Sequence, residues 1–298
     1  MAETLEHKQW QGTTDGPQFL HRAIIPVMRW TPLWLHYSVL VFYVLGYLTF
    51  SPKSRRVTYQ FFRQAMGWGR FKSMLGVLKN HFRFGQIITD RFAKYAGKKF
   101  NITVEGREIF DNLAEKPGCF MVISSHTGCY EMAGYSLTST KKRINTVSYG
   151  KEVKSIMDNR REQFAVTGTN MIFVNDDMSH LFEINNALRR GEVVSIPGDR
   201  LFGSTKYIVC DFFGRPAKFP RGPFATAAQR GAPVITAFVM KGRYRDYHMV
   251  VRSLTDGLPD GLSRAELEQT IAQNFASALE AELRKYPTQW FNYYDFWE

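Results

Sequence analysis

An uncharged apolar run near the N-terminus restricts what this chain can fold into. Residues 31–50, TPLWLHYSVLVFYVLGYLTF, hold no Asp, Glu, Lys or Arg. About twenty such residues are long enough to cross the hydrocarbon core of a bilayer. His36, Ser38 and Gly46 interrupt the run and also suit a helix that lies in the membrane interface. Three placements are therefore open, namely a spanning helix, an interfacial helix and an ordinary buried helix.

Positive charge is concentrated in the same third of the chain. The formal net charge is +12, and residues 1–100 hold 15 Lys and Arg against 4 Asp and Glu. A basic block of this kind favours an anionic polymer or an anionic membrane surface as partner. Because it adjoins the apolar run, a lipid surface is the better partner, and we expect no nucleic acid. The heavier positive flank, with Lys53, Arg55 and Arg56, follows the run and predicts that the remainder lies in the cytoplasm.

Residues 53–99 contain 12 Lys and Arg and a single acid, Asp90. Apolar residues recur at roughly helical spacing with basic residues between them, as in Phe71, Leu75 and Leu78 around Lys72. This pattern predicts a basic amphipathic helix on a membrane surface. A solvated helix that covers the core with an ordinary charged face fits the pattern as well.

From residue 100 onward, short apolar runs alternate with helical stretches. Strands are predicted over 119–124, 144–149, 193–196, 233–240 and 247–252, and helices over 154–166, 180–190 and 222–230. Ser263 and Glu266 form a capping box that opens a last helix, which ends near Tyr286-Pro287. The alternation predicts an α/β fold with a mixed central sheet flanked by helices, preceded by an apolar membrane helix. We expect an anchor over residues 1–52 and a single domain over 53–298, led in by the helical segment 53–99.

The segment VISSHTGCYEMAGY carries the main chemical hypothesis. A buried strand ends before His126, Gly128 permits a tight turn, and Glu131 starts a helix. Ligands of open α/β sheets bind beyond the carboxyl ends of the strands, so His126 stands where a catalytic base is expected. A carboxylate five residues on, in Glu131, can hold one ring nitrogen and leave the other to take a proton. His-x4-Glu spacing also arises by chance, and a metal pair is disfavoured because no cluster of further His or Cys ligands accompanies it in the sequence.

Two further segments offer charged groups. In IPGDRLFGS a strand is followed by Asp199 and Arg200, which would suit a phosphate or a developing oxyanion. An exposed surface salt bridge on a loop explains this pair equally well. In the stretch VCDFFGRPAKFPRGPF, Arg215 and Arg221 alternate with phenylalanines and could hold an anionic headgroup or carrier. A loop that packs its Phe side chains under the core is the alternative.

The cysteines and the N-terminus bear on location. The chain has three cysteines, Cys119, Cys129 and Cys210, and no Cys-x-x-Cys motif. This odd number and spacing favour reduced thiols in a cytosolic compartment. No apolar segment typical of a secretory signal begins within the first twenty residues. The expected location is an inner membrane, with the catalytic domain on the cytoplasmic side.

Taken in order, these segments resemble the bacterial lipid A late acyltransferase family, within the wider lysophospholipid acyltransferase superfamily. The matching segments are HTGCYE (His126–Glu131), VVSIPGDR, FFGRPA with GPFATAAQRGAPV, and the closing YPTQWFNYYDFW. The resemblance covers roughly residues 25–298 and includes the N-terminal apolar run. It implies catalytic roles for His126 and Glu131. Gly128, Asp199, Arg200, Arg215 and Arg221 are the candidates for binding substrate.

The resemblance also implies an acyl thioester donor, carried by acyl carrier protein or coenzyme A, and no bound cofactor or metal. Family members often have Asp-Gln where this chain has Asp199-Arg200, and the Glu-Gly-Thr-Arg motif of the glycerolipid branch is absent. The acceptor could therefore be a lipid A precursor, an amino-acid lipid or another glycolipid. A catalytically inactive membrane-binding or scaffold protein is the competing hypothesis. A lipid hydrolase or thioesterase is disfavoured because Gly-x-Ser-x-Gly is missing.

Overall fold

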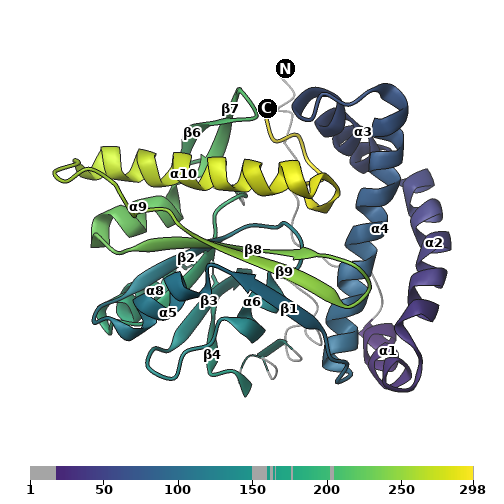
Figure 1. Ribbon diagram of the computed structural model, residues 1–298, viewed down its shortest axis with the longest axis horizontal. Helices are drawn as coiled ribbons and strands as arrows, with labels where there is room; N and C mark the ends of the chain where they lie inside the picture. The colour runs from purple at the N-terminus through teal and green to yellow at the C-terminus, as the bar shows by residue number, and fades with distance from the viewer. Residues whose placement is uncertain are drawn as a thin grey trace.

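A seven-stranded sheet forms the centre of the protein in the computed structural model, which describes residues 18–149, 160–161, 164, 166–175, 177–201 and 205–297 (Figure 1). Its strands are β1 (Asn101–Glu105), β2 (Phe120–Ser124), β3 (Ile144–Tyr149), β4 (Thr169–Val174), β5 (Val193–Pro197), β8 (Val234–Lys241) and β9 (Asp246–Ser253). Across the sheet they follow the order β1-β9-β8-β2-β5-β3-β4. β8 and β9 are antiparallel, and every other neighbouring pair is parallel. The predicted mixed α/β sheet is confirmed.

Helices cover both faces of the sheet. They are α5 (Arg107–Glu115), α6 (Glu131–Ser136), α8 (Ser179–Arg189), α9 (Arg221–Arg230) and α10 (Arg264–Lys285). One core joins the sheet to α8, α9 and α10, and in it Phe275 of α10 packs against Phe224 of α9 and Phe238 of β8. A second core joins it to α5 and α6 through Phe110 and Met132. The capping box of α10 forms as predicted, with Glu266 N–H donating to Ser263 Oγ at 3.3 Å.

Several elements differ from the sequence prediction. β1 and β4 were not predicted, nor was the two-stranded hairpin of β6 (Tyr207–Phe212) and β7 (Arg215–Pro220). This hairpin turns at Phe213 and Gly214, both with positive φ. The aromatic side chains around that turn are buried, because they pack against α10 and the C-terminal segment, residues 286–297. Most of the helix predicted over 154–166 lies outside the described residues.

The N-terminal third folds into a group of helices at one end of the sheet (Figure 1). They are α1 (Gln18–Trp30), α2 (Leu33–Phe50), α3 (Pro52–Gln60), the π-helical turn η1 (Phe61–Ala65) and α4 (Arg70–Tyr95). α2 packs along α4, where Gly85 leaves the room that the side chain of Leu40 occupies. Met28 and Leu33 share a small core with Phe92 of α4. The helices of the proposed anchor are therefore packed against the remainder of the protein.

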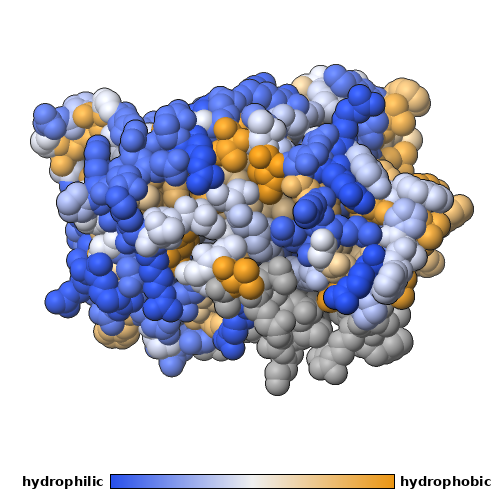
Figure 2. All heavy atoms as spheres, turned by 60° about the horizontal axis from the view of Figure 1, so that its bottom comes forward, coloured by the Kyte–Doolittle hydropathy of each residue, from blue (hydrophilic) through white to orange (hydrophobic). Residues whose placement is uncertain are grey.

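One face of α2 is exposed although it is apolar. The buried positions Leu33, Tyr37, Val44 and Leu48 recur at helical spacing and face α4. The exposed face carries Trp34, Val39, Phe42, Tyr43, Leu45 and Phe50. Figure 2 shows apolar surface along the margin where Figure 1 places α2. By length and composition α2 could cross a membrane. An exposed apolar surface of this extent marks a site of contact with a membrane or a protein.

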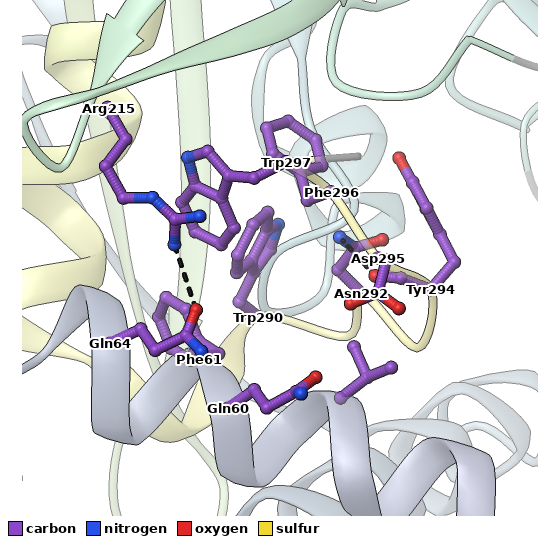
Figure 3. A pocket seen from close by; sticks show the side chains of 11 residues that line it. Gln60, Phe61, Gln64, Arg215, Trp290, Asn292, Tyr294, Asp295, Phe296 and Trp297 are labelled. Carbon is purple, nitrogen blue, oxygen red and sulfur yellow. Dashed lines mark hydrogen bonds between the residues drawn. The ribbon is translucent and has the colours of Figure 1, made fainter.

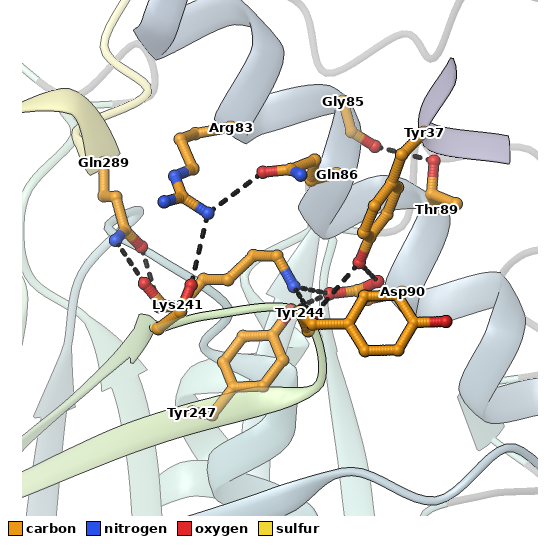
Figure 4. A network of polar contacts seen from close by, with 11 residues as sticks. Tyr37, Arg83, Gly85, Gln86, Thr89, Asp90, Lys241, Tyr244, Tyr247 and Gln289 are labelled. Atoms are coloured by element: carbon orange, nitrogen blue, oxygen red, sulfur yellow. Dashed lines mark hydrogen bonds and ion pairs between the residues drawn. The ribbon is translucent and has the colours of Figure 1, made fainter. Parts of the chain in front are cut away.

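A buried polar cluster fastens α2 and α4 to the sheet (Figure 4). The Asp90 carboxylate on α4 accepts hydrogen bonds from Lys241 Nζ of β8 and from Tyr247 OH of β9, both at 2.5 Å. Tyr37 OH of α2 donates to the same carboxylate. Burial raises the pKa of Asp90, although Lys241 opposes the shift. Since these groups come from three parts of the chain, the cluster fixes how α2 is docked.

Candidate active site

His126 and Asp199 are brought together by two neighbouring strands. β2 ends at Ser124 and β5 ends at Pro197, and these two residues face each other in parallel register. The chain continues beyond each strand for two residues, to His126 and to Asp199. The carboxyl ends of parallel strands form the edge where α/β sheets bind their ligands. The sheet therefore places the histidine and the aspartate side by side at the expected edge.

The contact between the two side chains is well defined. His126 Nδ1 lies 2.8 Å from Asp199 Oδ1, and the His126 backbone N–H donates to Asp199 Oδ2 at 2.8 Å. Burial raises the pKa of Asp199, but the His126 ring, its hydrogen bonds and Arg200 lower it, and the net pKa is below the ordinary value. Asp199 is therefore ionised at neutral pH. It fixes the orientation of the ring, which is 17% exposed, and makes Nε2 the nitrogen that takes a proton.

Close contacts with neighbouring strands explain two glycines in these loops. Gly128 has φ +50, and a Cβ there would lie 1.9 Å from the carbonyl oxygen of Val239 in β8. The neighbouring Cys129 N–H donates to that same oxygen at 2.8 Å. A Cβ on Gly198 would lie 2.4 Å from Ile123 Cγ2. Gly128, which we predicted to bind substrate, is thus required by the packing of the loop on β8.

The C-terminal segment holds the His126 loop in place. Gly128 N–H donates to Gln289 O at 2.9 Å, and Thr127 forms an isolated β-bridge with Trp290. The side chain of Gln289 exchanges two hydrogen bonds with the backbone of Lys241, at 2.8 and 2.7 Å. Through Lys241, this segment is connected to the buried cluster around Asp90. The sequence contains the stretch Pro-x-Gln-Trp, residues 287–290, but no local pattern in it predicts this supporting role.

Glu131 does not occupy the position that we predicted for it. Its buried carboxylate pairs with Arg91 of α4 and with Arg160, at 2.6 Å from Arg160 Nη2, and accepts from Tyr95 OH at 2.9 Å. The predicted pairing with the His126 ring is therefore wrong, and Asp199 takes that place. The reason is that α6 directs Glu131 toward α4. Burial raises the pKa of Glu131, but the two arginines and Tyr95 lower it below its ordinary value overall.

The three predicted arginines are distributed over different places. Arg200 is next to the site, and its Nη2 donates to Phe291 O at 2.8 Å. Arg215 lies on β7 and donates to Gln64 at 3.0 Å (Figure 3). Arg221 begins α9 and pairs with Glu268 of α10. Arg215 and Arg221 are thus held by other partners, since Arg215 lies in the β6–β7 hairpin outside the main sheet and Arg221 faces α10. Among the three, only Arg200 is placed beside the pair of His126 and Asp199.

Comparisons with known proteins identify the family of the chain. No curated protein matches the chain. Among solved structures, the 1-acyl-sn-glycerophosphate acyltransferase PlsC from Thermotoga maritima is similar, with a TM-score of 0.40 and 14% identity over 87% of this chain and 99% of that chain. The profile of the family described as bacterial lipid A biosynthesis acyltransferase matches residues 77–297. This match spans most of the chain and includes His126, Asp199 and the C-terminal segment. The chain belongs to the bacterial lipid A biosynthesis acyltransferase family.

Proposed function

We propose that this lipid acyltransferase moves a fatty acyl chain from an acyl thioester to a hydroxyl or amine of a lipid A-type glycolipid precursor. The observation that carries the proposal is the pair of His126 and Asp199 at the carboxyl ends of β2 and β5. A histidine held by an ionised carboxylate is suited to accept a proton from an acceptor hydroxyl. Family membership supports the acyl donor and the lipid acceptor.

The reaction can be written with these two residues. His126 Nε2 takes the proton of the acceptor hydroxyl while the oxygen of that hydroxyl attacks the thioester carbonyl carbon. The tetrahedral intermediate then expels the thiolate as the carbon–sulfur bond breaks, and the imidazolium returns its proton to that sulfur. Asp199 stabilises the imidazolium in between, since its carboxylate lies 2.8 Å from Nδ1. The donor thiol belongs to acyl carrier protein or to coenzyme A.

Mass spectrometry of lipids tests the proposed function directly. Cells that express the protein are expected to contain a glycolipid heavier by one acyl chain than the corresponding lipid in cells that lack it. Purified protein given the acceptor should form the same product with one of the two thioesters, which identifies the carrier. If the mass of an amino-acid lipid increases by one acyl chain instead, that lipid is the acceptor and the glycolipid is not. If the lipid masses stay unchanged with both thioesters, the competing hypothesis of a catalytically inactive membrane-binding protein is favoured.

We further propose that residues 1–52 dock the enzyme on the cytoplasmic face of an inner membrane, next to the catalytic domain that begins at residue 53. The exposed apolar face of α2 supports this placement, as do Lys53, Arg55 and Arg56 directly after it. Because α2 stays packed on α4, we propose that it enters the membrane with its exposed face and does not cross it as an isolated helix. Nearby basic residues add about 1 kcal/mol each on anionic lipid.

Replacing Phe42 by glutamate tests the docking face. Phe42 is 77% exposed on α2, and Phe182, 73% exposed on α8 at a distant place in Figure 1, is the matched control. We expect Phe42→Glu to weaken binding to anionic vesicles about ten- to a hundredfold, because one large apolar side chain contributes about 1.5–3 kcal/mol. Phe182→Glu should leave vesicle binding unchanged. If both variants bind vesicles as tightly as the unmodified protein in a flotation assay, the exposed face of α2 is not the docking face.

A further inference from the structure

The C-terminal segment is bound to α4 through the side chain of Asn80, which is 1% exposed. The Asn80 amide nitrogen donates to Trp290 O at 2.8 Å and to Thr288 O at 3.2 Å. Its amide oxygen accepts from Tyr293 OH at 3.1 Å, which fixes the orientation of the amide. Figure 1 shows the chain after α10 beside α4. Asn80 therefore binds two alternate carbonyl groups of the segment, as the backbone of a neighbouring strand would.

The opposite side of the same stretch of backbone binds the loop that carries His126. The carbonyl oxygen of Gln289 accepts from Gly128 N–H at 2.9 Å. The backbone N–H of Phe291 donates to His126 O at 3.4 Å. These groups alternate along the chain with the two carbonyls that Asn80 binds. The stretch thus joins α4 to the His126 loop, and a shift of the stretch would shift the loop.

The segment also supports the other half of the catalytic pair. Phe291 O accepts from Arg200 Nη2 at 2.8 Å. The hydroxyl of Tyr294 donates to Asp199 O at 3.3 Å. The contact of 2.8 Å between His126 Nδ1 and Asp199 Oδ1 depends on the position of both loops. Because both loops rest on one short segment, whatever fixes the segment fixes the distance between the ring and the carboxylate.

We propose that Asn80 is a positioning residue for acyl transfer, which holds the C-terminal segment so that the His126 ring stays against the Asp199 carboxylate. The buried Asn80 side chain does not touch the reacting groups and acts only through the backbone that it binds. The inference rests on the proposed function of His126 as the general base. Since α2 packs along α4, Asn80 also fixes the catalytic pair relative to the helices that we propose to dock on the membrane.

Nuclear magnetic resonance of the histidine rings tests the positioning role without any substrate. In the full-length protein, labelled with ¹⁵N-histidine in detergent micelles, the proton on His126 Nδ1 is expected to give a low-field signal because it is bound to the Asp199 carboxylate. This signal is assigned by its loss in His126→Ala. Asn80→Leu keeps a similar size but removes both donors of the amide. It should shift the signal upfield or broaden it, since the ring is then no longer held at a fixed distance from the carboxylate.

Kinetics give a second readout that a merely structural role would not produce. Asn80→Leu should lower kcat about ten- to a hundredfold, since a misplacement on the order of 1 Å costs rates of that size. The KM for the acyl thioester should stay the same, because the buried Asn80 side chain does not contact it. The same change combined with His126→Ala should lower the residual rate no further, since Asn80 acts through His126. A loss of folded protein would instead lower the rate by the same factor in both backgrounds.

Asn145→Leu is the matched control for both measurements. Asn145 is also 1% exposed, and its amide makes a similar set of hydrogen bonds, with Glu192, Val193 and Asn170. It lies near the start of β3, whereas the catalytic pair lies beyond the carboxyl ends of β2 and β5. Both leucine variants should lower the melting temperature to a similar extent, because each leaves buried polar groups unpaired. Only Asn80→Leu should change the His126 signal and kcat.

The proposal is overturned if the His126 signal is unchanged in Asn80→Leu, or if the loss of rate multiplies with that of His126→Ala. If Asn80→Leu does not fold, Asn80→Ser is measured in its place, because serine fits the same space and can donate to only one of the two carbonyls. An unchanged signal and kcat in that variant also overturn the proposal. Failure of the proposed function is distinct, since His126→Ala would then keep its rate while the ring signal would still report whether Asn80 positions His126.

Discussion

Replacing His126 by alanine is expected to lower the rate of acyl transfer by about two to four orders of magnitude, the usual effect of losing a general base. The fold should be retained, because the side chain is partly exposed at the end of β2 and its ring lies outside the main cores. Asp199→Asn should also reduce the rate strongly, since an amide cannot stabilise the imidazolium as an ionised carboxylate does. The measurement is initial rate with the acyl thioester at saturating acceptor, together with the melting temperature of each variant.

His248→Ala is the matched control for this experiment. His248 lies on β9 and its ring contacts Glu105, so the same substitution is made at a histidine of a different part of the sheet. Its rate should remain close to that of the unmodified protein. Near-normal turnover by His126→Ala, with vesicle binding intact, would contradict the assignment of the general base.

Glu131→Gln is expected to act mainly on stability. The carboxylate is 1% exposed and faces the guanidinium groups of Arg91 and Arg160. Removing one charge of a buried ion pair typically costs about 3–5 kcal/mol, because the opposite charge stays buried. For a protein of this size that corresponds to a fall in melting temperature on the order of 10 °C. Thermal unfolding in detergent measures the change. Glu115→Gln, at the exposed pair with Lys141, should shift the melting temperature little.

The pH dependence of stability follows from the same contacts. The pKa of Glu131 is lowered in the folded protein, so between that pKa and the ordinary value the unfolded chain binds more protons. The stabilisation from Glu131 is therefore complete above the ordinary value of 4.5 and is lost as the pH falls through the folded pKa. Glu131→Gln should remove this part of the acid sensitivity. If Glu131→Gln keeps a normal melting temperature but loses most of its activity, Glu131 acts on the reacting groups and not mainly on stability.

Most of the α/β fold could be predicted from local patterns. Apolar runs such as PVITAFVM predicted β8, whose residues are all buried, and the capping box predicted the start of α10. β1 and β4 were missed because their apolar pattern is weak, since none of the residues of β1 is buried and only Thr169 and Ile172 of β4 are. The β6–β7 hairpin was missed because its aromatic residues pack against distant segments, and no local periodicity reports such contacts.

The sequence by itself determined that His126 and Asp199 each follow a strand and would lie at one edge of the sheet. It also determined the apolar run and the basic flank that support membrane docking. Only the tertiary structure decided which carboxylate holds the histidine. Glu131 is closer in sequence, but α6 directs it to Arg91 and Arg160, whereas the parallel pairing of β2 with β5 brings Asp199 to the ring. Strand order arises from contacts distant in sequence, and spacing along the chain does not encode it.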